Sequence, residues 1–340
     1  MSFIVKLGLV GVAAGVGGLA TLSQLGDLRH GMGVEVPGLA SLSGLVGISA
    51  SAANPSAASP TGAPIDKTFT VRRVHIDGIV ARVELVTVPT PGPVRLQATG
   101  KPEVLKELEV RTVGDELLLH LEIEDEDQAW FPWNLFNLWG EDRKVRDLSI
   151  RITAPVGTPY ELEGMVGTLN AGNIDAPLRL VGHAVEARIG NTLSADVSIK
   201  GSGDITLGSV KETLDLDIAG GGDVKIGQVL GSVRTDIKGA GDVRIAQVAG
   251  PVDLKIKGAG DILIEQGRAD PFSIDISGAG DVTFKGHAVN PTIKIRGAGD
   301  VTVDSYSGQL RQEISGAGNF TVRQQTQPPT PTPPAPPAQP

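Results

Sequence analysis

The chain has 340 residues, of which 45 are glycine, about twice the usual share, while aromatic residues make up only 4%. A hydrophobic fraction of 40% carried mainly by Val, Ile, Leu and Ala predicts thin packed layers and argues against a thick helical globule. The net charge of -9 comes without a basic stripe, which argues against a nucleic-acid partner, and the absence of cysteine excludes thiol catalysis and thiolate metal sites.

The first 52 residues have the pattern of an export signal or a signal anchor. Lys6 precedes an uncharged, glycine-broken run over residues 7–22, which is short for a transmembrane span. A second apolar stretch ends in Ala50-Ser51-Ala52, a small-x-small sequence that suits cleavage. We therefore expect export, with either cleavage or retention of the segment as an anchor.

Composition divides the remainder of the chain. Residues 53–66 are rich in Ser, Ala and Pro and predict a linker, and residues 324–340 predict a disordered Pro-rich tail in polyproline II conformation. Residues 67–170 predict an irregular β region, since apolar and polar residues alternate over residues 117–123 and 148–153. No helix is expected between Lys67 and Arg323.

An aromatic insertion at residues 125–145 interrupts this β region and holds all three tryptophans of the chain. One interpretation is that it covers the open end or flank of the β structure and shields edge strands. The other is an exposed patch that binds a protein, a glycan by ring stacking, or a membrane interface. The candidate residues for partner binding are Trp130, Phe131, Trp133, Phe136 and Trp139.

A tetrad of the form Gly-small-Gly-Asp recurs at intervals of 19 or 20 residues. The tetrads begin at Gly201, Gly220, Gly239, Gly258, Gly278, Gly297 and Gly316. A fixed interval of this length indicates one structural unit stacked on the next. The glycines are expected to make sharp corners, both through positive φ and by allowing neighbouring coils to approach.

An isoleucine column accompanies the tetrads, at Ile199, Ile218, Ile237, Ile256, Ile276, Ile295 and Ile314. One coil of this length cannot pair with itself, so each strand must pair in parallel with its equivalent one coil later. Residues 171–323 therefore predict an all-β fold, a right-handed parallel β-helix with coils of about 19 residues, in which each Ile rests on the next.

The fourth tetrad position forms a column of Asp204, Asp223, Asp242, Asp261, Asp281, Asp300 and Asn319. Carboxylates stacked at about 4.8 Å repel one another, so each needs compensation. We expect each Asp to accept hydrogen bonds from backbone N–H groups at its own corner. Calcium bridging adjacent coils is the alternative, although known calcium-binding β-helix repeats have a different period.

An outward column, Asp217, Asp236, Lys255, Asp275, Lys294 and Glu313, mixes both signs of charge. This pattern predicts a solvated face with ion pairs, and no pair of carboxylates stands out as a glycosidase pair. Nucleophile-elbow, zinc-protease and phosphate-loop motifs are also missing. The sequence therefore predicts no catalytic, cofactor or metal site, and a protein that is not an enzyme.

The Gly-Ala-Gly-Asp corners, with Ile76-Asp77-Gly78-Ile79 before an alternating strand and the Ala154-Pro155 turn, resemble the head GIN domain family of autotransporter adhesin heads. The resemblance runs from about residue 67 to residue 323 and implies an exported bacterial β-solenoid in the periplasm or at the cell surface. We expect an adhesin-like binding or structural module. A polysaccharide-active β-helix enzyme and a self-assembling scaffold remain alternatives, and a homo-oligomer remains open.

Overall fold

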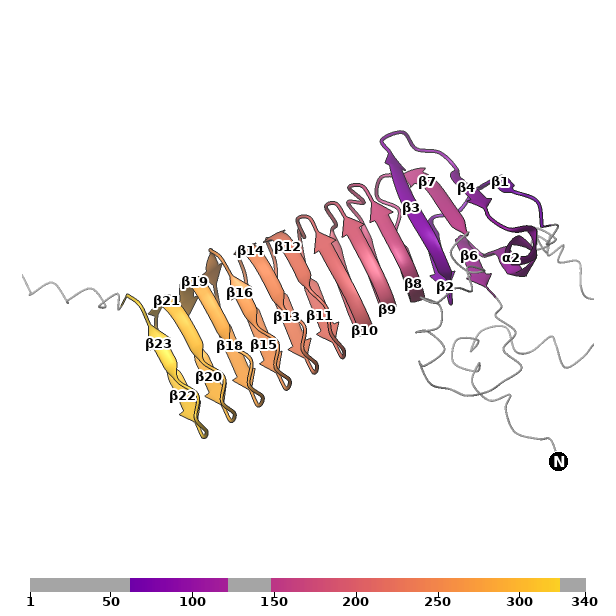
Figure 1. Cartoon of the computed structure of the whole chain (residues 1–340). Helices are drawn as coiled ribbons and strands as arrows, with labels where there is room; N and C mark the ends of the chain where they lie inside the picture. The colour runs from indigo at the N-terminus through magenta and orange to yellow at the C-terminus, as the bar shows by residue number, and fades with distance from the viewer. Residues whose placement is uncertain (1–61, 122–147, 325–340) are drawn as a thin grey trace, which may run out of the picture. The chain divides into compact units, whose positions relative to one another are not determined.

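The computed structural model describes residues 62–121 and 148–324. The expected export region, the aromatic insertion and almost all of the Pro-rich tail lie outside these residues. The described residues form a parallel β-helix in which two ladders of strands stack coil on coil (Figure 1). The predicted fold class is confirmed.

The first ladder contains, in spatial order, β6 (Glu116–Leu121), β2 (Arg73–Asp77), β8 (Tyr160–Ala171), β9 (Pro177–Ile189), β10 (Ser194–Leu207), β11 (Leu214–Ile218), β13 (Val233–Ile237), β15 (Val252–Ile256), β18 (Phe272–Ile276), β20 (Thr292–Ile295) and β22 (Arg311–Ile314). Every neighbouring pair in this ladder is parallel.

The second ladder contains β3 (Val80–Val88), the second halves of β8, β9 and β10, then β12 (Val224–Val229), β14 (Val243–Val248), β16 (Ile262–Ile264), β19 (Val282–Val289), β21 (Val301–Ser307) and β23 (Phe320–Val322). The short strand β17 (Arg268–Ala269) pairs with β19. Apolar residues of both ladders face inward and form the core between them.

The isoleucine column is confirmed as a continuous stack in the first ladder. Each Ile is the register partner of the Ile one coil later, from Ile199 to Ile314. The first six are 0% exposed, whereas Ile314 in the last coil is partly buried. β-Branched side chains suit this in-register stacking because they pack well on a pleated surface.

Glycine is required at the first position of the tetrads because adjacent coils pack too closely there to leave room for a side chain. A Cβ added at Gly220 would lie 1.8 Å from the carbonyl oxygen of Gly201, and one at Gly239 would lie 1.7 Å from that of Gly220. None of the seven tetrad-opening glycines has a positive φ. The expectation of positive φ is therefore wrong at this position, and the close approach of the next coil is what requires glycine.

Antiparallel strands and a helix distinguish the N-terminal end of the β-helix. On the second ladder, β1 (Ile65–Phe69) pairs with β4 (Val94–Thr99), β4 pairs with β7 (Ser149–Pro155), and β7 runs parallel to β3. On the first ladder, β5 (Leu108–Val113) forms an antiparallel hairpin with β6. Because β1 starts at Ile65, ordered structure begins inside the segment expected to be linker.

Helix α2 (Pro102–Glu107) lies between β4 and β5 and buries Val104 and Leu105. The expectation of no helix was wrong here, because six residues are too few to show helical periodicity. Its local signal is Pro102, whose fixed φ suits the first turn of a helix. Within residues 62–121 and 148–324, no helix has the length and apolar character needed to cross a bilayer.

Candidate functional site

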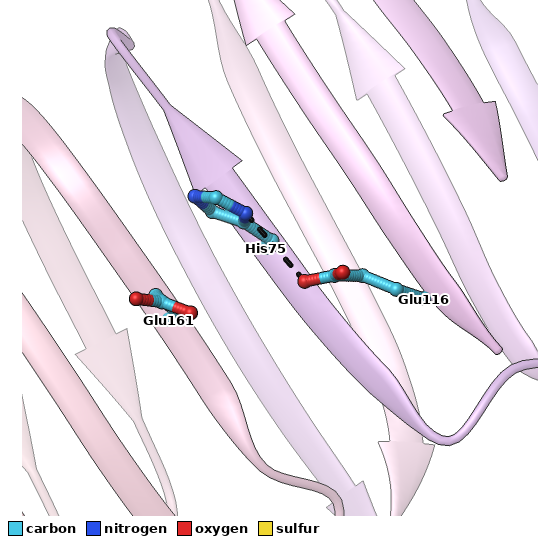
Figure 2. A group of neighbouring side chains, drawn as sticks. All are labelled: His75, Glu116 and Glu161. Atoms are coloured by element: carbon cyan, nitrogen blue, oxygen red, sulfur yellow. Dashed lines mark ion pairs between the residues drawn. The ribbon is translucent and has the colours of Figure 1, made fainter. Parts of the chain in front are cut away.

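Three potential metal-ligating side chains meet on the outward face of the first ladder, near its N-terminal end (Figure 2). His75 lies on β2, the strand between β6 and β8, and its register partner on β8 is Glu161. Glu116 on β6 is the partner of Arg73, two residues before His75. Because alternate residues of a strand share a face, all three side chains project outward, and we refer to them as the His75 cluster.

The His75 cluster is compact and half-buried. One ligand atom from each residue lies within 4.8 Å of the other two, and His75 Nδ1 is 3.5 Å from Glu116 Oε1. The His75 and Glu116 side chains are 24% and 26% exposed. Two carboxylates beside one imidazole offer oxygen and nitrogen ligands to a cation.

Arg179 on β9 forms an ion pair with Glu161 of this cluster. Its Nε lies 3.3 Å from Glu161 Oε1 and 3.2 Å from Glu163 Oε1, and its Nη1 contacts Asp196 on β10. The hydrogen bond to Glu163, with smaller contributions from the charges around it, raises the pKa of Arg179. One guanidinium therefore forms ion pairs with three carboxylates, so acidic side chains outnumber basic ones at this position.

A groove of about 530 Å³ extends from the His75 cluster across β8 to β11. The charged residues of its lining are Arg73, Glu116, Glu161, Arg179, Asp196 and Asp215. Desolvation raises the pKa of Asp215, and the neighbouring charge of Asp196 acts in the same direction. Burial also raises the pKa of Tyr160, whose hydroxyl has no hydrogen-bond partner among the described residues.

Aspartates of the column accept hydrogen bonds from backbone amides, as expected, but the expectation that each donor lies at the same corner as its Asp is wrong. The N–H groups of Asp261, Asp281 and Asp300 donate to Oδ1 of the preceding aspartate at 3.0, 2.8 and 2.7 Å. The acceptor therefore serves the next coil rather than its own corner. Asn319 continues this pattern by donating its N–H to Asp300 at 2.8 Å.

The outward charged column has the predicted register, from Asp217 to Glu313. Lys238 Nζ lies 2.5 Å from Asp217 Oδ2, and Arg296 binds Asp275 at 2.6 Å. Side chains of adjacent coils thus neutralise one another, and the interpretation as a face laced with ion pairs is confirmed.

The candidate residues for partner binding, Trp130, Phe131, Trp133, Phe136 and Trp139, all lie outside the described residues, so their role remains a prediction. The His75 cluster was missed by the sequence reasoning. Alternation identifies His75 and Glu161 as outward-facing, but no local signal shows that their strands are neighbours.

Comparison with solved structures gives the following likenesses. A "putative adhesin" from Parabacteroides distasonis is 14% identical with a TM-score of 0.41, over 77% of this chain and 97% of that one. A "putative adhesin" from Bacteroides fragilis is 15% identical with a TM-score of 0.36, over 77% and 98%. A "putative lipid binding protein" from Parabacteroides distasonis is 13% identical with a TM-score of 0.39, over 80% and 97%.

No curated protein matches the chain. The model of one protein family, described as "Putative auto-transporter adhesin, head GIN domain", matches residues 86–264 and 230–326. These two matches overlap and together cover more than half of the sequence, including the whole regular part of the β-helix. The chain therefore belongs to the head GIN domain family.

Proposed function

We propose that this protein is an exported, non-catalytic β-solenoid that acts as an adhesin-like binding or structural module at the bacterial cell envelope. The observation that carries the proposal is the unbroken outward face of the first ladder, in which strands from β6 to β22 lie parallel in consecutive coils. Such a face presents side chains at a fixed spacing of about 4.8 Å, which suits an extended partner. The adhesin description of the family supports this role.

The electrostatics of this face favour binding over catalysis. Asp217, Asp236 and Asp275 each have a cationic partner from another coil, Lys238, Lys257 and Arg296 respectively. The face therefore presents exposed charges of both signs along consecutive coils, which suits contact with a partner surface of mixed charge.

The test uses intact bacterial cells that produce the tagged full chain. We expect protease added outside to remove the tag where the protein is at the surface, or only after outer-membrane permeabilisation where it is periplasmic. In the surface case, cells should adhere to immobilised glycans or proteins. Retention of the tag inside the inner membrane would refute export, and turnover of a soluble polysaccharide by the purified chain would favour the enzyme alternative.

A matched pair of variants tests which face binds. Lys255→Glu with Lys294→Glu reverses charge on the first ladder, whereas Lys225→Glu with Arg244→Glu does so at exposed outward positions on the second. We expect the first pair to reduce adhesion and the second to leave it near the level of the unaltered protein. Equal effects would show that the first ladder is not the binding face.

The aromatic residues of the insertion belong to the same proposal as a separate contact for a protein, a glycan or a membrane interface. Trp133→Ala with Trp139→Ala should then reduce adhesion without lowering the melting temperature. A lower melting temperature with intact adhesion would show a structural role instead.

A further inference from the structure

His75 differs from His120 and His287 in the partners that surround it. His287 has hydroxyl partners at both ring nitrogens, Ser305 Oγ at 3.0 Å and Ser307 Oγ at 2.8 Å. His120 Nδ1 lies 3.2 Å from Asp77 Oδ2, and these two residues belong to no group of three potential metal ligands among the described residues. His75 instead faces two carboxylates, from strands on either side of its own (Figure 2).

The hydrogen-bonding capacity of the His75 ring is not used by the described residues. Its Nδ1 is 3.5 Å from Glu116 Oε1, longer than a good N–H···O hydrogen bond. Its Nε2 is shielded from solvent and has no hydrogen-bond partner among the described residues. Most buried polar groups in folded proteins have a hydrogen-bond partner, so this ring nitrogen keeps the capacity to bind a further group.

We propose that the His75 cluster binds a divalent transition-metal ion, and that Zn²⁺ is the ion its ligands fit best. Imidazole nitrogen and carboxylate oxygen are both ordinary Zn²⁺ ligands, whereas Ca²⁺ takes six to eight oxygens and Mg²⁺ retains several waters. Three protein ligands leave at least one coordination position for water or for a group of a partner molecule.

The geometry requires little movement to bind the ion. Zn²⁺ bonds of about 2.0–2.2 Å place tetrahedral ligand atoms about 3.4 Å apart. The ligand atoms of the His75 cluster already lie within 4.8 Å of one another. Side-chain rotations that shorten these separations by up to about 1.4 Å would therefore close the site. The three strands are fixed in register by their backbone hydrogen bonds, which limits the entropy lost on binding.

Arg179 supplies the outer support that metal-bound carboxylates usually have. Its Nε is 3.3 Å from Glu161 Oε1. A carboxylate has two oxygens, so Glu161 can keep this contact through one oxygen and bind the ion through the other. With neutral His75, the two glutamates bring two negative charges, which match a divalent cation.

The test is calorimetric titration of the full chain with Zn²⁺, supported by the visible absorption spectrum with Co²⁺, which reports coordination. We expect one ion per chain at this site. Both His75→Ala and Glu161→Gln should weaken the affinity by more than about tenfold and change the Co²⁺ spectrum. The control variants His120→Ala and Glu163→Gln should bind as the unaltered chain does, because they leave all three ligands in place.

Circular dichroism of each variant separates loss of the site from loss of the fold, and the isosteric Glu161→Gln decides the result if His75→Ala unfolds. Absence of Zn²⁺ binding by the unaltered chain would overturn the proposal. Unchanged affinity in folded Glu161→Gln would also overturn it, as would displacement of Zn²⁺ by an equal concentration of Ca²⁺. None of these outcomes bears on adhesion, so the metal site and the proposed function are tested separately.

Discussion

Thr235 places a hydroxyl group in the core of the β-helix. It occupies an inward position of β13 between Leu216 and Leu254, its side chain is 0% exposed, and its Oγ1 has no hydrogen-bond partner among the described residues. Burying an unpaired hydroxyl costs about 1–3 kcal/mol. We therefore expect Thr235→Val to raise the free energy of unfolding by about 1 kcal/mol, measured by denaturant titration.

The control is Thr206→Val, at an exposed outward position of β10, which should change the free energy of unfolding little. A loss of stability in Thr235→Val would show that the hydroxyl does have a partner in solution.

Asp215 makes stability depend on pH with a definite sign. Burial, reinforced by Asp196 and opposed by Arg234, raises its pKa in the folded state. The folded chain then binds the proton more tightly than the unfolded chain does. The ionised side chain therefore destabilises the fold increasingly as pH rises from the unfolded value of about 3.9 through the higher folded pKa.

We expect Asp215→Asn to melt at a higher temperature than the unaltered protein at pH 7, and the two melting temperatures to converge towards pH 4. Thermal melting followed by circular dichroism at both pH values measures this. An equal difference at the two pH values would assign the effect to packing rather than to charge.

At the corner between two strands, the adjacent residues Gly220 and Gly221 differ in the space available for a side chain. A Cβ at Gly220 would lie 1.8 Å from a carbonyl oxygen of the preceding coil, whereas a Cβ at Gly221 meets nothing within 4 Å. We expect Gly220→Ala to lower the free energy of unfolding by about 1–3 kcal/mol, because the coils must separate. Gly221→Ala should be nearly neutral, and similar losses in both variants would refute the packing explanation.

The regular coils could be predicted because residues that pair between coils recur in the sequence at a fixed interval. Val233 pairs with Val252 and Ile237 with Ile256, so the 19-residue repeat specifies register directly. The N-terminal end has no such guide. Strand β2 lies between β6 and β8, although no sequence repeat relates the three strands. The proximity of His75 to two glutamates therefore could not be predicted from the sequence.

At the scale of the whole β-helix, the two ends are protected unequally. Antiparallel strands and α2 cover the N-terminal end, while the last coil, β22 and β23, pairs on one side only within the described residues. Its apolar residues Ile314 and Phe320 are only partly buried. In stacked repeats each coil gains stability only from its neighbours, so the last one should open most easily.

We therefore expect amide hydrogen exchange to be fastest in β22 and β23 and to slow towards β13 and β15. Ile256→Ala should cost about 2–5 kcal/mol of unfolding free energy, because it leaves a cavity in a closed stack. Ile314→Ala should cost clearly less. Uniform protection from β13 to β23 would show that the coils unfold as one unit.

The interval between coils also has a consequence for how a gene of this kind can change length. In the regular coils most register partners are 19 residues apart. Gly267 still pairs 19 residues after Val248, whereas Phe272 pairs 20 residues after Val252, so the extra residue of this longer coil lies between Gly267 and Phe272. Removal of residues 239–257 would join Lys238 to Gly258 and restore the same local sequence of Ile, Lys, Gly, Ala, Gly and Asp. We expect the chain with this deletion to fold and to unfold in one cooperative thermal transition. Removal of residues 239–247 should abolish that transition, because the loss of nine residues turns inward positions outward and places unlike strands in register. Duplication or loss of whole coils therefore offers evolution a way to lengthen or shorten the outward face of the first ladder while keeping the register of the remaining strands.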